Sequence, residues 1–198
     1  MSYILGKKTE MSQIFDEKGR VVPVTWIKAG PCFVLQLKTD KKDNYSAVQV
    51  GFEKKEKNIK KTEKNKEYKH IREFRVENEK LKDFKGGEKI DVSIFKEGDK
   101  VKVSGISKAK GFQGVVKRWG FHGSSKTHGT KHTVRKPGSI GATDPARVFK
   151  GKKMAGRTGG RRITSSGLKV FKIDKEKNLI AIKGAVPGRR GTLLEIKG

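Results

Sequence analysis

The stretch Val21-Val22-Pro23-Val24-Thr25-Trp26-Ile27 consists almost entirely of β-branched and aromatic residues. After the breaker Gly30-Pro31, the run Phe33-Val34-Leu35-Gln36-Leu37 is again apolar. Residues of these kinds pack well on a pleated surface, and a Gly-Pro pair interrupts a strand. The sequence therefore predicts two consecutive strands here, which favour a β fold.

Similar runs continue on both sides of a long basic segment, and turn residues separate them. The predicted strands are residues 45–52, 71–76, 90–95, 101–106, 168–173, 179–182 and 192–196. The charged residues 174–178 between two of these runs predict a hairpin turn. This spacing favours one antiparallel β-barrel, closed or partly closed, that a single insertion interrupts. We therefore predict a mainly β protein with a long, basic, glycine-rich extended loop insertion and a short helix.

The charge of the chain restricts its partners. The sequence has 48 Lys and Arg against 21 Asp and Glu, a net charge of +27. Such a surface repels itself unless a polyanion neutralises it. A second Lys-rich run, residues 53–69, mixes eight Lys with four Glu, and we expect a solvated loop or a frayed helix there.

More than half of the net charge lies in residues 105–165. This basic segment holds 15 Lys and Arg, one acid (Asp144) and 12 of the 24 glycines. It has too few aliphatic side chains to bury itself. We therefore predict a β-barrel domain made of residues 1–104 and 166–198, and an extension of residues 105–165 that a polyanion neutralises.

One helix is predicted inside the basic segment. Its apolar face has the i, i+3, i+4, i+7 spacing and comprises Phe112, Val115, Val116 and Trp119. That face would dock on the barrel, while Lys117 and Arg118 point outward. Beyond Gly120 the periodicity ends, so residues 121–160 are expected to form a glycine-punctuated extended loop.

Several classes of protein are excluded. No stretch approaches the roughly 18 apolar residues of a membrane span, and the first twelve residues lack the apolar core of a secretory signal. The single Cys32 cannot form an intrachain disulfide or a cysteine zinc site, and we expect a small buried thiol in a reducing compartment. The stretch Leu5-Gly6-Lys7-Lys8-Thr9 lacks the first glycine of a P-loop, so nucleotide chemistry is not expected.

Three of the four histidines, His122, His128 and His132, lie in the basic segment. Without a carboxylate or thiol nearby they are a weak metal signal, and the surrounding cations repel a divalent ion. An RNA-processing enzyme that uses His122 and His128 remains an alternative, although no carboxylate is in place to orient either ring. Hydrogen bonds from these rings to RNA phosphate or sugar are the favoured interpretation.

The cations of the basic segment are the candidate nucleic-acid contacts. Neighbouring glycines let backbone N–H groups approach phosphates, Arg can fork onto a phosphate or stack on a base, and Lys acts as a point charge. RNA is favoured over DNA because no helix-turn-helix, basic zipper or zinc finger is visible, although a nucleoid-type DNA binder remains an alternative. The candidates are Lys108, Lys110, Lys117, Arg118, Trp119, His122, Lys126, His128, Lys131, His132, Arg135, Lys136, Arg147, Lys150, Lys152, Lys153, Arg157, Arg161 and Arg162.

Four blocks of the sequence resemble the bacterial-type large-subunit ribosomal protein L-three family. They are MSQIFDEKGRVVPVTWIKAGPCFVLQLKT (11–39), SGISKAKGFQGVVKRWGFHG (104–123), PGSIGATDPARVFKGKKMAGR (137–157) and NLIAIKGAVPG (178–188). The resemblance implies a translation-protein-type β-barrel and an extension that threads between helices of the large-subunit (23S-type) rRNA toward the peptidyl-transferase centre. Ala142, Thr143 and Asp144 would lie near the tip of that extension, and this tip lacks the glutamine that some family members methylate.

The resemblance also implies a role. The protein would be a cytoplasmic, structural constituent of the large ribosomal subunit that supports its early assembly and buttresses the peptidyl-transferase region. The RNA, not this protein, would carry out peptide transfer. The expected partners are the rRNA and neighbouring large-subunit proteins, with L-fourteen and L-nineteen as candidates. No membrane, small-molecule substrate or cofactor is expected, apart from Mg²⁺ associated with the rRNA.

Overall fold

The computed structural model describes residues 2–57, 59 and 66–198 and is mainly β, with few and short helices. This confirms the predicted fold class at that level. The chain forms two compact units: the first comprises Met1–Ile106 and Arg162–Gly198, and the second comprises Ser107–Arg161.

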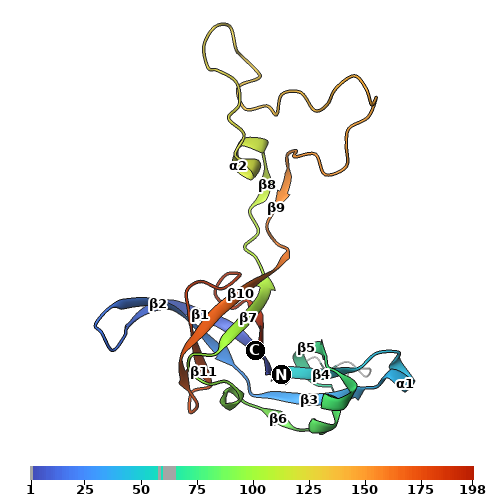
Figure 1. Ribbon diagram of the computed structural model, residues 1–198, viewed down its shortest axis with the longest axis vertical. Helices are drawn as coiled ribbons and strands as arrows, with labels where there is room; N and C mark the ends of the chain where they lie inside the picture. Colours follow the sequence, from blue (N-terminus) through green and yellow to red (C-terminus); the bar gives the residue numbers. More distant parts are fainter. Residues whose placement is uncertain (1, 58, 60–65) are drawn as a thin grey trace. The chain divides into compact units, whose positions relative to one another are not determined.

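The first unit contains a closed antiparallel barrel (Figure 1). Around the barrel the strands follow the order β1-β12-β7-β10-β11-β2, and β2 pairs back onto β1. The bounds are β1 Tyr3–Phe15, β2 Val21–Ala29, β7 Lys100–Ile106, β10 Arg162–Asp174, β11 Leu179–Lys183 and β12 Leu193–Lys197. All of these strands except β1 overlap a strand predicted from the sequence.

A second sheet in the same unit has the order β5-β4-β3-β6. Its strands are β3 Cys32–Lys38, β4 Ala47–Lys54, β5 Tyr68–Arg75 and β6 Lys89–Ile90. The prediction that all strands share one barrel is therefore wrong for this group. The reason is that β1 and β11 occupy both edges of β2, so the chain that leaves β2 through Gly30 must start a new sheet. The N–H of Gly30, at φ 72°, donates to the carbonyl of Leu5 and fixes this change of direction.

Short helices fill the connections. They are α1 (Asp40–Asp43) and the 3-10 helices η2 (Asn78–Asp83) and η3 (Val92–Ile94). The predicted strand over residues 90–95 is therefore wrong beyond Ile90. Three residues per turn place Val92 and Phe95 on the same side, and both side chains are buried there.

One hydrophobic core joins the barrel to the second sheet. The barrel contributes fully buried residues such as Ile4, Ile180 and Leu194, and the sheet contributes Val48 and Val50. The ring of Tyr3 stacks on that of Phe74 at a centroid distance of 4.3 Å, which links the first barrel strand to β5. Burial of this apolar surface is the main favourable contribution to folding of the first unit.

The Lys-rich run 53–69 is in part outside the described residues, which exclude 58 and 60–65. Its two ends are not the loop or helix that we predicted, because Glu53 lies in β4 and Lys69 in β5. The Glu53 carboxylate lies 2.5 Å from the Lys7 ammonium and 3.7 Å from that of Lys69. Charges that appear solvated in the sequence thus link β4 both to β1 of the barrel and to β5 of its own sheet.

Cys32 is a buried thiol, as predicted. Its Sγ donates to the carbonyl of Leu5 at 3.5 Å. Burial raises the pKa of the thiol to about 12. The thiol therefore stays neutral in the folded protein over the whole range of ordinary buffers.

This pKa has a consequence for stability at high pH. An unfolded cysteine ionises near pH ~8.5, so above that pH the unfolded state releases a proton that the folded state keeps. We expect the free energy of unfolding to fall by about 1 kcal/mol more in the parent than in Cys32→Ala between pH ~7.5 and ~9.5, measured by urea denaturation. Equal falls in both proteins would contradict the buried, neutral thiol.

Gly6 of β1 is required for close strand packing. A Cβ at this position would lie 2.8 Å from Cγ2 of Ile27 and 2.9 Å from the carbonyl oxygen of Lys28. We expect Gly6→Ala to destabilise the protein by about 1–3 kcal/mol, because the backbone of β2 must move. The matched control is Gly86→Ala, which has nothing within 4 Å and no positive φ. Similar urea midpoints for both variants would refute the packing argument.

Candidate nucleic-acid interface

The second unit is built on a short antiparallel ribbon of β8 (Gly111–Gln113) and β9 (Gly156–Thr158). Backbone hydrogen bonds continue the pairing beyond the strands, from Lys110 N to Thr158 O at 2.9 Å and from Ser107 N to Arg161 O at 3.0 Å. Gly159, at φ 72°, crosses so close to the carbonyl of Lys108 that a Cβ would collide with it. Glycine at this position therefore permits the two sides of the ribbon to meet.

The helix predicted in this region is shorter than expected. Helix α2 comprises only Val115–Trp119, and Gly120, at φ 74°, ends it with its N–H bonded to the carbonyl of Val116. Phe112 lies in β8 and is 75% exposed, so its place on the helical face was predicted wrongly. Phe112 pairs with Arg157 of β9, so it belongs to a strand that ends before the helix begins. Docking of the helix on the barrel stays a prediction.

Two side chains of α2 share one acceptor on the returning chain. The indole Nε1 of Trp119 donates to the carbonyl of Met154 at 2.8 Å, and a guanidinium N–H of Arg118 donates to the same oxygen at 2.9 Å. The Arg118 guanidinium also lies 4.9 Å from the centroid of the Trp119 ring, and the Lys153 ammonium lies 5.8 Å from it. Gly156 leaves room for Arg118, because a Cβ there would lie 2.5 Å from its guanidinium. This tether fixes two cations beside an indole ring that is 41% exposed.

Residues 121–155, all of which the structure describes, contain no helix or strand. One hydrogen bond, from Ser124 N to Val134 O at 3.0 Å, closes part of this loop. Gly123, at φ 79°, sits against the carbonyl of Val134 where a side chain would clash. Most of the loop's side chains are exposed, and so are Ala142, Thr143 and Asp144 of the predicted tip.

The predicted RNA contacts lie on the surface. Arg118 is half-buried, and each of the other candidates is exposed. A groove brings Trp119, His122, Lys136 and Lys153 together, with Phe121 and Pro137 also in its lining. The groove thus combines cations with an indole and an imidazole, which are groups that can bind phosphates and stack on bases. The remaining candidates are spread along the ribbon and the loop.

Arg162 is placed differently from the other candidates. It belongs to β10 in the first unit, and its guanidinium forms an ion pair with the carboxylate of Glu195. Arg72 lies 3.5 Å from the same carboxylate. No local pattern predicts this pairing, because Glu195 is 33 residues away along the chain.

The histidines of the second unit show no catalytic arrangement. Among the described residues there is no group of three His, Cys, Asp or Glu that could hold a metal ion. Within the same part of the chain, no hydrogen bond joins a ring of His122, His128 or His132 to a carboxylate. The feature that sequence reasoning missed is the Met154 carbonyl, a backbone group that no side-chain pattern reveals.

The electrostatics of the second unit follow from its composition. Ser107–Arg161 contains 14 Lys and Arg and one acid, Asp144, so its formal charge is +13. Exposed cations at this density bind polyanions, and irregular loops that carry an aromatic ring suit folded RNA. No helix within the described ranges is long and apolar enough to span a membrane. The exposed basic surface of the second unit therefore places this chain in the class of RNA-binding proteins.

Comparison with known sequences identifies the family. Residues 38–180 match the family described as "Ribosomal protein L3". The chain is 51% identical to the large ribosomal subunit protein uL3 of Carboxydothermus hydrogenoformans, over 98% of this chain and 95% of that protein. It is 50% identical to the uL3 of Chloroherpeton thalassium, over 99% and 98% of the two chains, and 48% identical to that of Thermosipho africanus, over 100% and 98%. The chain belongs to the ribosomal protein L3 family.

The tether to Met154 can be tested in the isolated protein. Trp119→Phe removes the indole donor but keeps an aromatic ring, and a hydrogen bond of this kind contributes about 0.5–1.5 kcal/mol. We expect the amide protons of residues 154–158 to exchange roughly two- to tenfold faster in this variant, measured by hydrogen exchange. Phe112→Leu, an exposed substitution in β8, is the control and should leave these rates unchanged. Unchanged rates in Trp119→Phe would rule out the tether.

Proposed function

We propose that this protein is a structural, non-enzymatic constituent of the large ribosomal subunit and that its second unit binds the 23S-type rRNA. The observation that carries the proposal is the charge of the second unit, with 14 cations and one carboxylate on a largely exposed surface. Membership of the ribosomal protein L3 family, across nearly the whole chain, supports the same role. A surface of this charge repels itself, and RNA phosphates that neutralise it remove that repulsion.

Binding follows from two kinds of contact. Lys and Arg side chains release counterions from the RNA as they neutralise phosphates, which supplies most of the affinity and makes it depend on salt. The groove with Trp119 and His122 adds stacking and hydrogen bonding to exposed bases or sugars. The first unit supplies a hydrophobic core that the barrel and the second sheet share.

Finer features of the role extend this proposal. The second unit would thread into the folded rRNA as an extension from a translation-protein-type barrel, with Ala142, Thr143 and Asp144 near the peptidyl-transferase centre. The protein would bind early in assembly, would buttress that centre, and would have L-fourteen and L-nineteen among its protein neighbours. It would need no cofactor of its own, because Mg²⁺ at the interface would be held by the RNA. These expectations rest on the family resemblance and on the exposure of the three tip residues.

Replacement of three loop cations tests the proposal. Lys150, Lys152 and Lys153 are exposed and lie within four residues of one another. We expect the Glu substitutions at these positions to lower the incorporation of a tagged copy into large subunits, measured by sedimentation of cell lysates at about 100 and about 500 mM salt. Loss of three phosphate contacts should reduce the slope of log affinity against log salt by about 2–3 for a purified rRNA fragment.

The control makes the same change in net charge elsewhere. Lys169, Lys175 and Lys177 are exposed residues of the first unit, in β10 and in the turn before β11. Their triple substitution by Glu should leave incorporation close to that of the parent. Equal losses in the two triple variants would mean that total charge, and not the second unit, governs binding.

A further inference from the structure

A pocket of about 270 Å³ lies in the first unit, where β2 leads into the second sheet. Its lining includes three aromatic side chains, which are Phe33 of β3, Phe52 of β4 and Tyr68 of β5. The volume is slightly below the ~300–1,000 Å³ that is typical of sites for small molecules. The pocket therefore suits a flat group of the size of one nucleobase.

Two of these rings lie next to each other on the sheet. The ring centroids of Phe33 and Tyr68 are 5.8 Å apart, and the ring planes make an angle of 35°. The Tyr68 ring lies directly over Gly51 of β4, because a Cβ at position 51 would be 2.6 Å from Cγ of the ring. Both side chains are half-buried, so part of each ring is open to solvent. Aromatic rings that are accessible on an antiparallel sheet form a platform on which unpaired bases stack.

The one acid in the lining is compensated by two lysines. Glu53 adopts φ 56°, which is uncommon for a residue that has a side chain. Its carboxylate forms ion pairs with the ammonium groups of Lys7 and Lys69, at 2.5 and 3.7 Å. The negative charge of Glu53 is therefore neutralised before any ligand arrives.

Two further lysines of the lining have no acidic partner. Lys28 of β2 and Lys54 of β4 are exposed, and neither forms an ion pair within the part of the chain that the structure describes. Lys54 also lines a neighbouring hollow, which is bordered by four lysines and one acid. Positive charge of this kind attracts phosphates. Exposed lysines beside aromatic rings thus complement both parts of a nucleotide, its phosphate and its base.

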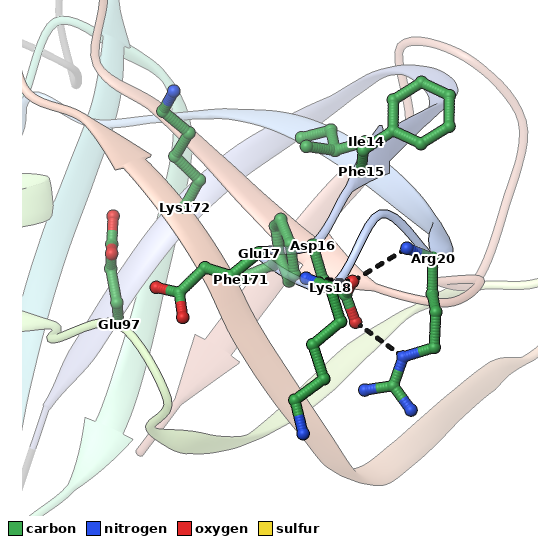
Figure 2. Close-up of a pocket in the computed structure, with 9 residues that line it drawn as sticks. All are labelled: Ile14, Phe15, Asp16, Glu17, Lys18, Arg20, Glu97, Phe171 and Lys172. Atoms are coloured by element: carbon green, nitrogen blue, oxygen red, sulfur yellow. Dashed lines mark hydrogen bonds and ion pairs between the residues drawn. The ribbon is translucent and has the colours of Figure 1, made fainter.

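The pocket shown in Figure 2 lacks this combination. It is larger, with a volume of about 560 Å³, and it lies beside the tip of the β1–β2 hairpin. Three acids and three bases line it, and the dashed lines in the figure join Asp16 to Arg20. Balanced charges give this second pocket no preference for a polyanion.

We propose that the pocket beside Tyr68 binds one unpaired nucleotide of the large-subunit rRNA. The base would stack on Tyr68 and Phe33, and the flanking phosphates would pair with Lys28 and Lys54. This inference rests on the proposed function and extends it, because it adds an RNA site on the first unit to the basic surface of the second. A base that enters the pocket must leave its own helix, so the site recognises a bulge, a loop or a strand end and not a regular duplex.

Site-specific cross-linking in assembled subunits tests which molecule occupies the pocket. A photoreactive benzoylphenylalanine replaces Lys54, large subunits that contain this variant are purified and irradiated, and reverse transcription locates any adduct on the RNA. We expect an rRNA adduct at one nucleotide and its immediate neighbours. Tyr68→Leu in the same protein should reduce this adduct at least about tenfold, since the base loses its stacking partner, whereas Tyr68→Phe should retain it.

Three results of this experiment would overturn the nucleotide site. They are an adduct with a protein, no adduct, and an rRNA adduct that Tyr68→Leu leaves unchanged. A free nucleotide is tested separately, by irradiating the purified Lys54 variant with an excess of uridine monophosphate. An adduct with that nucleotide and none with rRNA would also overturn the proposal, because the pocket would then be a site for free nucleotides.

Affinity for purified large-subunit rRNA measures the contact. We expect Tyr68→Leu to weaken binding about tenfold and Tyr68→Phe to change it less than about twofold. Lys28→Gln with Lys54→Gln should lower the slope of log affinity against log salt by about 1.4, since each phosphate contact to a single strand contributes ~0.7. The control is Lys41→Gln with Lys42→Gln in α1, where both lysines are exposed, and it should leave the slope unchanged. Urea midpoints check that each variant folds.

The parent protein separates the two proposals. Failure of the parent to bind the rRNA would refute the proposed function itself. Binding by the parent that neither Tyr68→Leu nor the Lys28 and Lys54 pair weakens would refute only the nucleotide site, because the second unit would then account for all of the affinity.

Discussion

Mutual repulsion among the cations of the second unit is the constraint on which the rest of the structure depends. A segment of charge +13 with one carboxylate cannot collapse around a core of its own. The first unit therefore supplies the hydrophobic stability of the protein, through a barrel and a sheet that share one core. The second unit is held by backbone pairing, glycines and a single shared carbonyl, and these contacts leave its cations free for a ligand.

Where apolar residues form local runs, the sequence predicted the strands. Residues 21–27 and 33–37 became β2 and β3, and residues 101–106 and 179–182 lie within β7 and β11. β1 was missed because Gly6 to Glu10 has no apolar alternation. Lys8 of β1 is buried, and its ammonium donates to the carbonyls of Val186 and Gly188. A local sequence pattern cannot predict hydrogen-bond partners that are so distant along the chain. The separate second sheet was missed for a similar reason, since strand order depends on which edges are already occupied.

For the candidate interface, composition was sufficient to place the cations on the surface, because Lys and Arg side chains without acidic partners are almost never buried. Composition could not place them relative to one another. The groove around Trp119 depends on the turn at Gly120, and the ion pair of Arg162 with Glu195 depends on the register of β10. Helical periodicity was misleading at Phe112, where pairing with β9 prevailed over the apolar spacing.

The place in the strand order at which the second unit is inserted determines how easily its length can change. It is inserted between β7 and β10, which are neighbours in the barrel, and Ile106 is directly paired with Arg162. The two ends of the insertion therefore lie opposite each other in the ladder, where a two-residue hairpin turn could join β7 to β10. Since the entropy of closing a loop grows only slowly with its length, the barrel tolerates an insertion of almost any size at this point. A change in the length of the insertion therefore leaves the pairing of β7 with β10, and with it the barrel, in place.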